Sequence, residues 1–239
     1  MKSSSILLVE DDRLIAQARI RDLSGRGYRI HIVYSGTEAL KYLDESGSAA
    51  PGLILMDVDL GDGPDGIDTA KRILTKTDMP ILFLTNHANP EYLRRAQEVG
   101  VFGYIPKSAN GAFLEASFRM AVQLHGTIQQ FKASEAKFRA MVDSLPLAVL
   151  EADLDGCLLT VNPAAEALFG WRREEVTGRY APQVPASFKP EYDAIRQRIA
   201  SGESFINREV LRQRKDGRII RLLLSTAPVR DASDRKSVV

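Results

Sequence analysis

Short apolar runs alternate with amphipathic stretches along the first half of the chain. Five runs are almost uninterrupted, as expected for strands covered on both faces, and they lie at residues 6–9, 30–33, 53–56, 81–84 and 101–105. Four stretches with helical spacing of apolar residues separate them, at residues 13–23, 37–43, 67–74 and 91–99. Alternating strands and helices with short connections predict a parallel sheet with helices on both faces.

A long helical pattern follows at residues 111–145 and meets its first proline at Pro146. Its apolar residues recur at intervals of three and four, interrupted only at Glu135, and they are Leu114, Phe118, Ala121, Leu124, Ile128, Phe131, Phe138, Val142 and Leu145. Such a stripe is typical of a coiled-coil seam. The two successive intervals of three, from Phe118 to Ala121 and from Ala121 to Leu124, form a stammer. We therefore expect a parallel homodimer through this helix. Residues 114–124 are expected to pack on their own sheet, and packing on the following domain is the alternative for residues 128–145.

Beyond this helix the pattern changes to that of an antiparallel sheet. Four segments resemble strands, at residues 147–152, 158–161, 205–211 and 219–226. Asp216-Gly217 lies between the last two, and Asp-Gly is a strong hairpin signal. Asn162 is suited to cap a short helix starting at Pro163, and Gly170 to end it in a left-handed conformation. The second half therefore predicts an α+β domain.

The composition is that of an ordinary soluble globular protein, with 44% apolar and 26% charged residues among 239. The formal net charge of +1 gives no overall field that attracts nucleic acid or an anionic membrane. The single cysteine, Cys157, excludes an intrachain disulfide. No apolar run approaches the roughly 20 residues of a membrane span or the pattern of a signal peptide. We expect a cytoplasmic protein without nucleic-acid or membrane partners.

Polar residues follow most of the apolar runs in the first half. Glu10 and Asp11 follow the first run, Asp57 the third and Thr85 the fourth, and Lys107 comes soon after the fifth. Because the carboxyl ends of parallel strands meet at one edge of a sheet, these side chains are expected to converge. Crowded carboxylates raise one another's pKa, and a hard ion such as Mg²⁺ relieves that repulsion. An Asp nucleophile, Mg²⁺ and a lysine are the parts that phosphoryl transfer to a carboxylate requires.

This pattern resembles the response-regulator receiver family of two-component signalling. The matching segments cover about half of the chain, and they are residues 6–12, 55–57, 84–85 and 104–107. The resemblance implies a flavodoxin-like, doubly wound parallel sheet of strand order 2-1-3-4-5. It implies that Asp57 is the phosphoacceptor and that Mg²⁺ is bound by Asp57, Asp11, Glu10 and the backbone carbonyl of Asp59. Asp12 falls outside this set and is expected to cap the following helix.

The resemblance also implies that Thr85 and Lys107 contact the phosphoryl group and that Thr85 and Tyr104 form a switch pair. The chain departs from the family at two positions. Ser108 stands where the family usually has a proline, often after a cis bond. We expect a trans bond here, because a cis non-proline bond costs about 3 kcal/mol. Asn86 follows Thr85 where the family has a smaller residue.

A phosphatase of the haloacid-dehalogenase type is the alternative from another functional class. The segment Asp57-Val58-Asp59 has the Asp-x-Asp form of that family. That family places a threonine two residues after the second Asp, where this chain has Gly61, and it carries the motif on its first strand. The receiver is therefore the favoured interpretation.

The second half resembles the PAS sensor family from about Glu135 to the end. The resemblance rests on residues 161–171, 175, 178 and 215–218. It implies a PAS domain, truncated at its last strand. Leu168, Phe169 and Trp171 are expected to form core, and contact with a ligand is the alternative for them. The segment contains no histidine for an axial haem ligand, and Cys157 lacks the Asn-Cys-Arg-Phe setting of a flavin photosensor, so we expect no bound cofactor in it.

The sequence therefore predicts a receiver domain at residues 1–124, a linking helix at 113–145 and a PAS domain at 135–239. The expected function is phosphorelay signalling. A histidine kinase or phosphotransfer protein would phosphorylate Asp57, and the change would pass through the helix to the PAS domain. The chain as it stands is not expected to be an enzyme. The input part of a hybrid histidine kinase, with its kinase core further downstream, is the alternative.

Overall fold

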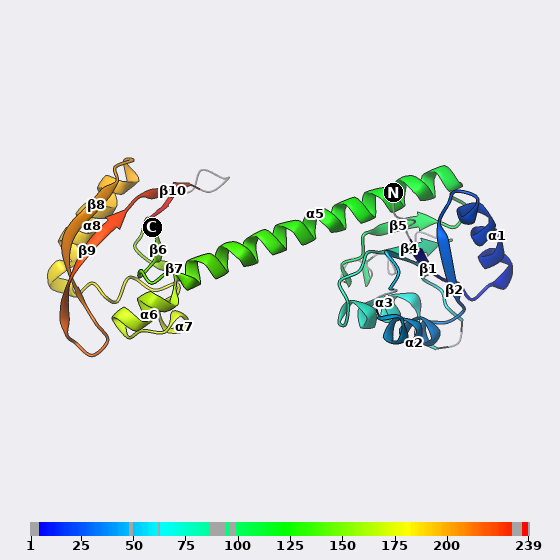
Figure 1. Ribbon diagram of the computed structural model, residues 1–239, viewed down its shortest axis with the longest axis horizontal. Helices are drawn as coiled ribbons and strands as arrows, with labels where there is room; N and C mark the ends of the chain where they lie inside the picture. The colour runs from blue at the N-terminus through cyan, green and yellow to red at the C-terminus, as the bar shows by residue number, and fades with distance from the viewer. Residues whose placement is uncertain are drawn as a thin grey trace. The chain divides into compact units, whose positions relative to one another are not determined.

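The computed structural model describes residues 5–47, 50–61, 63–86, 94–95, 99–230 and 236–238, and the chain divides into two compact units, Met1–Lys132 and Ala133–Val239 (Figure 1). Among the described residues, no helix has the length and apolar character needed to cross a membrane.

The first unit is built on a five-stranded parallel sheet of order β2-β1-β3-β4-β5. Its strands are β1 (Ser5–Val9), β2 (Arg29–Val33), β3 (Leu53–Asp57), β4 (Ile81–Thr85) and β5 (Gly103–Pro106). The predicted flavodoxin-like order is confirmed. The last strand begins two residues later than predicted, because Val101 and Phe102 are apolar for another reason: they pack against the two hydrophobic clusters on opposite faces of the sheet.

Capped helices cover the two faces of this sheet. The first three are α1 (Arg13–Ser24), α2 (Gly36–Ser46) and α3 (Gly66–Leu74). Asp12 Oδ1 accepts the backbone N–H groups of Leu14 and Ile15, so its predicted role as a helix cap is confirmed. One hydrophobic cluster joins the sheet to α2 and α3, and the other joins it to α1 and α5. The predicted helix at residues 91–99 lies mostly outside the described residues.

The helix α5 (Gly111–Ser144) is continuous over 34 residues. Its first turns bury Leu114, Phe118 and Ala121 in the cluster shared with α1, as predicted, but Leu124, which was expected in the same contact, is 53% exposed. Further along, side chains of α5 reach the loop before β4, where Asp78 accepts hydrogen bonds from Gln129 at 2.5 Å and Lys132 at 2.8 Å. These hydrogen bonds lower the pKa of Asp78 to about 2. Polar contacts therefore attach α5 to the first unit as far as Lys132, beyond the apolar contact with the sheet.

The second unit is α+β with antiparallel strands, as predicted. Its elements are β6 (Leu150–Asp153), β7 (Leu158–Val161), α6 (Pro163–Phe169), α7 (Arg173–Val176), the 3-10 helix η2 (Ala186–Phe188), α8 (Lys189–Ala200), β8 (Phe205–Gln213), β9 (Ile219–Thr226), β10 (Pro228–Arg230) and β11 (Lys236–Val238). One sheet has the order β10-β11-β6-β7, and β8 pairs with β9. The helices α7, η2 and α8 and the strands β10 and β11 were not predicted from the sequence.

Asn162 organises the start of the second unit. Its Oδ1 accepts the N–H of Ala165 and so caps α6, and it also accepts the N–H of Val149. Its Nδ2 donates to the carbonyl oxygens of Val142 and Leu147. Because Asn162 bonds the backbone around residues 147–149, the strand predicted from residue 147 begins only at residue 150.

The other local signals of the second half behave as predicted. Gly170 ends α6 with φ +80°. The Asp216-Gly217 turn connects β8 to β9, with the Arg214 N–H donating to the carbonyl oxygen of Arg218. The three apolar residues expected in the core contribute to one hydrophobic cluster, and they are Leu168, Phe169 and Trp171.

Candidate functional site

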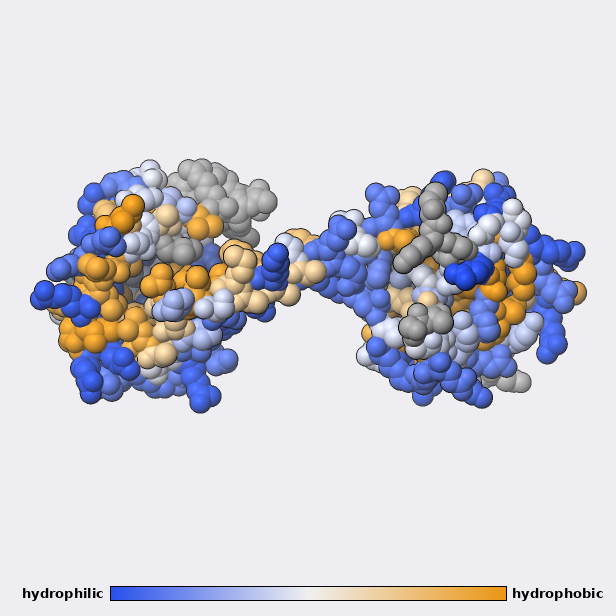
Figure 2. Space-filling view, in the orientation of Figure 1, coloured by the Kyte–Doolittle hydropathy of each residue, from blue (hydrophilic) through white to orange (hydrophobic). Residues whose placement is uncertain are grey.

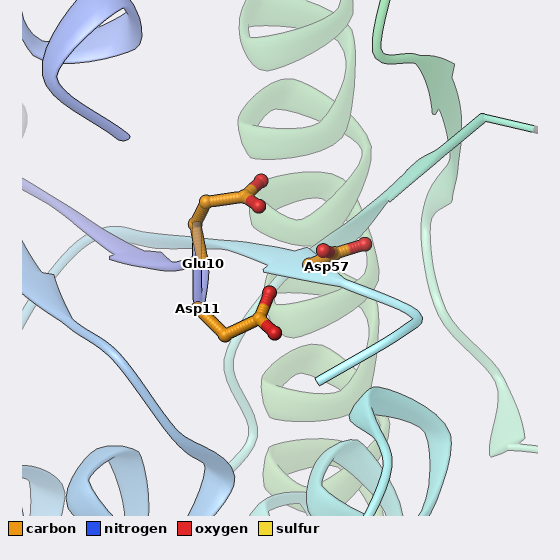
Figure 3. A group of neighbouring side chains, drawn as sticks. All are labelled: Glu10, Asp11 and Asp57. Carbon is orange, nitrogen blue, oxygen red and sulfur yellow. The ribbon is translucent and has the colours of Figure 1, made fainter. Parts of the chain in front are cut away.

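Three carboxylates meet at the carboxyl edge of the parallel sheet. Glu10 and Asp11 directly follow β1, and Asp57 is the last residue of the neighbouring strand β3. One ligand oxygen from each residue lies within 4.8 Å of those of the other two (Figure 3). Glu10 and Asp57 are buried, whereas Asp11 is exposed. The sequence pattern therefore located the convergence of these acids correctly.

Lys107 joins this group from the loop after β5. Its Nζ donates to Asp57 Oδ2 at 2.5 Å and to Glu10 Oε1 at 2.9 Å, and its side chain is 10% exposed. The backbone N–H of Lys107 donates to the Thr85 carbonyl oxygen at 2.9 Å, which attaches this loop to the end of β4. The ammonium thus bridges two buried carboxylates.

Burial controls the ionisation of the site. It raises the pKa of Glu10 from 4.5 to about 7, although the Lys107 hydrogen bond acts in the opposite direction. Burial also raises the pKa of Asp57, against the hydrogen bond and charge of Lys107. Burial lowers the pKa of Lys107, but the two carboxylates outweigh it, so that this pKa is raised. The site is therefore an acidic cluster in which burial favours the protonated carboxyl groups and Lys107 supplies one positive charge.

The loop after β3 orients the acids through its backbone. The N–H of Asp59 donates to Asp57 Oδ1 at 3.2 Å, and the N–H of Gly61 donates to Asp11 Oδ2 at 3.1 Å. A Cβ at Gly66 would overlap the carbonyl oxygen of Asp57, so only glycine lets α3 start this close to β3. The sequence analysis assigned no role of this kind to Gly61 or Gly66, since nothing in a local pattern shows which backbone will approach.

The residues present fit a hard divalent cation. The donor set is all oxygen, which Mg²⁺ prefers. Glu10 Oε2 is buried and has no hydrogen-bond partner among the described residues. Because a buried, unpaired carboxylate oxygen is costly, this atom is suited to receive a cation. Asp12 is absent from the cluster, in agreement with its role as the cap of α1.

The other predicted residues of the first unit lie in or next to β4 and β5. Thr85 ends β4 at the same edge of the sheet. Tyr104 lies in β5, its ring centroid 6.1 Å from that of Phe83, and burial raises its pKa. The bond between Lys107 and Ser108 is trans.

Arg19 is a residue that the sequence analysis missed. It lies on the buried side of α1 and donates to the carbonyl oxygens of Lys107 and Ala109. An arginine within an amphipathic helix is usually solvent-exposed, so no local pattern indicated this contact.

Known proteins match both halves of the chain. Residues 6–119 match the response regulator receiver domain, and residues 136–239 match the PAS fold. The sensor kinase CckA of Brucella abortus is 34% identical over 109 residues, which cover 44% of this chain and 11% of CckA. The transcriptional regulatory protein CpxR of Klebsiella pneumoniae is 30% identical over 162 residues, which cover 66% of this chain and 68% of CpxR.

Among solved structures, the chain is similar to the N-terminal domain of a response regulator/sensory box/GGDEF 3-domain protein from Carboxydothermus hydrogenoformans. The two are 36% identical, the match covers 52% of this chain and 97% of that domain, and the TM-score is 0.48. Neither the two family matches nor the similarity to CckA and CpxR favours the phosphatase alternative. The parallel sheet of order 2-1-3-4-5, the two family matches and the similarity to CpxR lead to one conclusion: the chain belongs to the response-regulator family and consists of a receiver domain followed by a PAS domain.

Proposed function

We propose that the receiver domain accepts a phosphoryl group on Asp57 from a histidine kinase or phosphotransfer protein. The contact that carries this proposal is the 2.5 Å bond from Lys107 Nζ to Asp57 Oδ2 at the carboxyl edge of the sheet. In the reaction an Asp57 carboxylate oxygen attacks phosphorus, the bond from phosphorus to the donor breaks, and the donor leaves with the bonding electron pair. Lys107 would then bind a phosphoryl oxygen, and the Thr85 hydroxyl would donate to another.

Mg²⁺ would be held by Glu10, Asp11 and Asp57, with the Asp59 backbone carbonyl as the remaining protein ligand. When bound, the ion supplies positive charge that stabilises both the clustered carboxylates and the phosphoryl oxygens. The orphaned Glu10 Oε2 and the all-oxygen donor set support this assignment. Asp11 would contribute most, because its exposed carboxylate is the one that Lys107 does not contact in the hydrogen bonds described above.

The assignment of Asp57 is tested by intact mass after incubation with a small-molecule phosphodonor and Mg²⁺. The wild type is expected to gain one phosphoryl group, and Asp57→Asn none. Asp12→Asn is the matched control, because asparagine also caps helices and Asp12 lies outside the acidic cluster. Normal phosphoryl uptake by Asp57→Asn would overturn the assignment. Equal uptake by the wild type with and without chelator would overturn the role of Mg²⁺.

We further propose that the change at Asp57 passes through α5 to the PAS domain, with Thr85 and Tyr104 as the switch pair. A phosphoryl group adds charge that can bias an element between two packings. The contacts of α5 with the receiver as far as Lys132 support this route. Receiver and PAS domains are signalling modules rather than catalytic ones. We place the protein in the cytoplasm, either as a regulator acting by protein contact or as the input part of a hybrid kinase.

We also propose that α5 forms a homodimer. Its apolar stripe continues beyond the buried first turns with exposed side chains, at Leu124, Ile128, Phe131, Phe138 and Leu145. Figure 2 shows hydrophobic and hydrophilic residues interspersed along this part of the helix. Exposed apolar residues at intervals of three and four are the pattern that a partner helix covers in a coiled coil.

A further inference from the structure

Arg19 on α1 is buried against the loop that carries Lys107. The residue is 8% exposed. Its Nη1 donates to the Ala109 carbonyl oxygen at 3.1 Å, and its Nη2 donates to the Lys107 carbonyl oxygen. Burial lowers the pKa of this guanidinium. The charges of Asp22 and Glu10 partly offset this desolvation, but both hydrogen-bond acceptors of the guanidinium are neutral backbone groups of the loop.

Backbone hydrogen bonds and the packing of Ala109 against the cluster shared by α1 and α5 also restrain this loop. The N–H of Lys107 donates to the Thr85 carbonyl oxygen, and the N–H of Ala109 donates to that of Pro106. Between them stands Ser108, whose φ is not restricted by a ring as that of proline is. The guanidinium fork holds the two carbonyl groups on either side of Ser108. Arg19 therefore restrains the backbone on both sides of Ser108.

The Lys107 backbone fixes the point from which the flexible four-carbon side chain reaches the two carboxylates. A displaced backbone would therefore change the distance over which the ammonium must reach Asp57 and Glu10. Nζ lies 2.5 Å from Asp57 Oδ2 and 2.9 Å from Glu10 Oε1. We infer that Arg19 is a positioning residue: by holding the carbonyl groups of Lys107 and Ala109, it aims the Lys107 ammonium at Asp57. This inference rests on the proposed function of Asp57 as phosphoacceptor.

The first test is a double-mutant cycle on the full chain, measured as the rate of phosphoryl uptake from a small phosphodonor with Mg²⁺. Arg19→Met keeps a long side chain but removes both donors, and a rate loss of roughly tenfold to a hundredfold is expected, as for a misplaced catalytic group. In a Lys107→Ala background the same change is expected to have no further effect. Equal losses in both backgrounds would mean that Arg19 only supports the fold, and would overturn the inference.

Two further variants separate positioning from packing. Arg19→Lys retains one charged donor and can serve one of the two carbonyl groups, so a rate between those of wild type and Arg19→Met is expected. Arg21→Met is the matched control, because Arg21 is an exposed arginine of the same helix, and it is expected to leave the rate unchanged. A loss in Arg21→Met as large as that in Arg19→Met would also contradict the inference.

A second measurement does not depend on phosphoryl uptake. Amine acylation of the full chain, read residue by residue by mass spectrometry, is expected to be several-fold faster at Lys107 in Arg19→Met than in wild type. The exposed Lys41 serves as the internal reference. Unchanged acylation of Lys107 would overturn the inference. Faster acylation in a chain whose wild type takes no phosphoryl group would instead support the positioning by Arg19 and refute the proposed function.

Discussion

The buried Glu10 predicts an unusual dependence of receiver stability on pH. Its pKa is raised from 4.5 to about 7, chiefly by burial, so the folded state retains a proton that the unfolded state releases. Without metal, the contribution of Glu10 to the free energy of unfolding is therefore greatest below about pH 4.5, and it is lost as the pH rises through 7. At ~1.36 kcal/mol per pH unit, the full effect at pH 8 is about 3 kcal/mol.

Replacing Glu10 by Gln removes this ionisation and keeps an oxygen that can accept from Lys107. The new amide nitrogen stands where Oε2 has no partner among the described residues, so part of the gain is lost. We expect metal-free Glu10→Gln to be more stable than wild type by ~1–2 kcal/mol at pH 8. At pH 5 the difference in the free energy of unfolding is expected to shift by ~2 kcal/mol in favour of wild type, so that the variant has no advantage there. Saturating Mg²⁺ is expected to reverse the order, because an ion that binds only the folded state stabilises it.

Native-state hydrogen exchange of the β1 and β3 amides in chelator is the appropriate assay. Trp171 belongs to the PAS domain, so tryptophan fluorescence does not report on the receiver. The exchange free energies of wild type and Glu10→Gln would be compared at pH 5, 6, 7 and 8. A metal-free variant that is less stable than wild type at pH 8, or a difference that does not change with pH, would refute the reasoning.

Three further predictions concern the metal, the helix and the dimer. Asp11→Ala is expected to weaken Mg²⁺ binding at least tenfold in an NMR titration, and unchanged affinity would contradict its role as the main ligand. Asp78→Asn is expected to change receiver stability by less than ~1 kcal/mol, because the Asp78 side chain is 51% exposed. Hydrogen exchange of the α5 amides near Lys132 should nevertheless accelerate. Unaltered exchange would show that the contact with Asp78 does not hold the helix. Ile128→Glu/Phe131→Glu is expected to be monomeric in sedimentation experiments at tens of micromolar while wild type is dimeric; a monomeric wild type, with and without phosphodonor, would leave α5 as a spacer only.

Sequence alone determined the features that depend on local pattern. Continuous apolar runs predicted the parallel sheet, and the polar residues that end them predicted the meeting of Glu10, Asp11 and Asp57. Asp12 and Asn162 were recognised as helix caps, because capping links a side chain to a backbone N–H only two or three residues away. Such signals are readable because the partners are neighbours in the chain.

The limits of local pattern are visible in α8. Only Ile195 and Ile199 of this helix are buried, so its apolar stripe is too narrow to stand out from its many charged residues. The strand expected from residue 147 begins later for a related reason, since Asn162 bonds the preceding backbone from 13 to 20 residues away.

Only the tertiary structure decided how the site is supported. The contact of Arg19 with Lys107 spans 88 residues of sequence, that of Gly61 with Asp11 spans 50, and that of Lys132 with Asp78 spans 54. Whether an arginine is exposed or buried against a distant carbonyl depends on which elements the fold brings beside it. Hydrophobic periodicity carries no information about such pairs, because it records the face that each element buries but not the polar group that the face will meet.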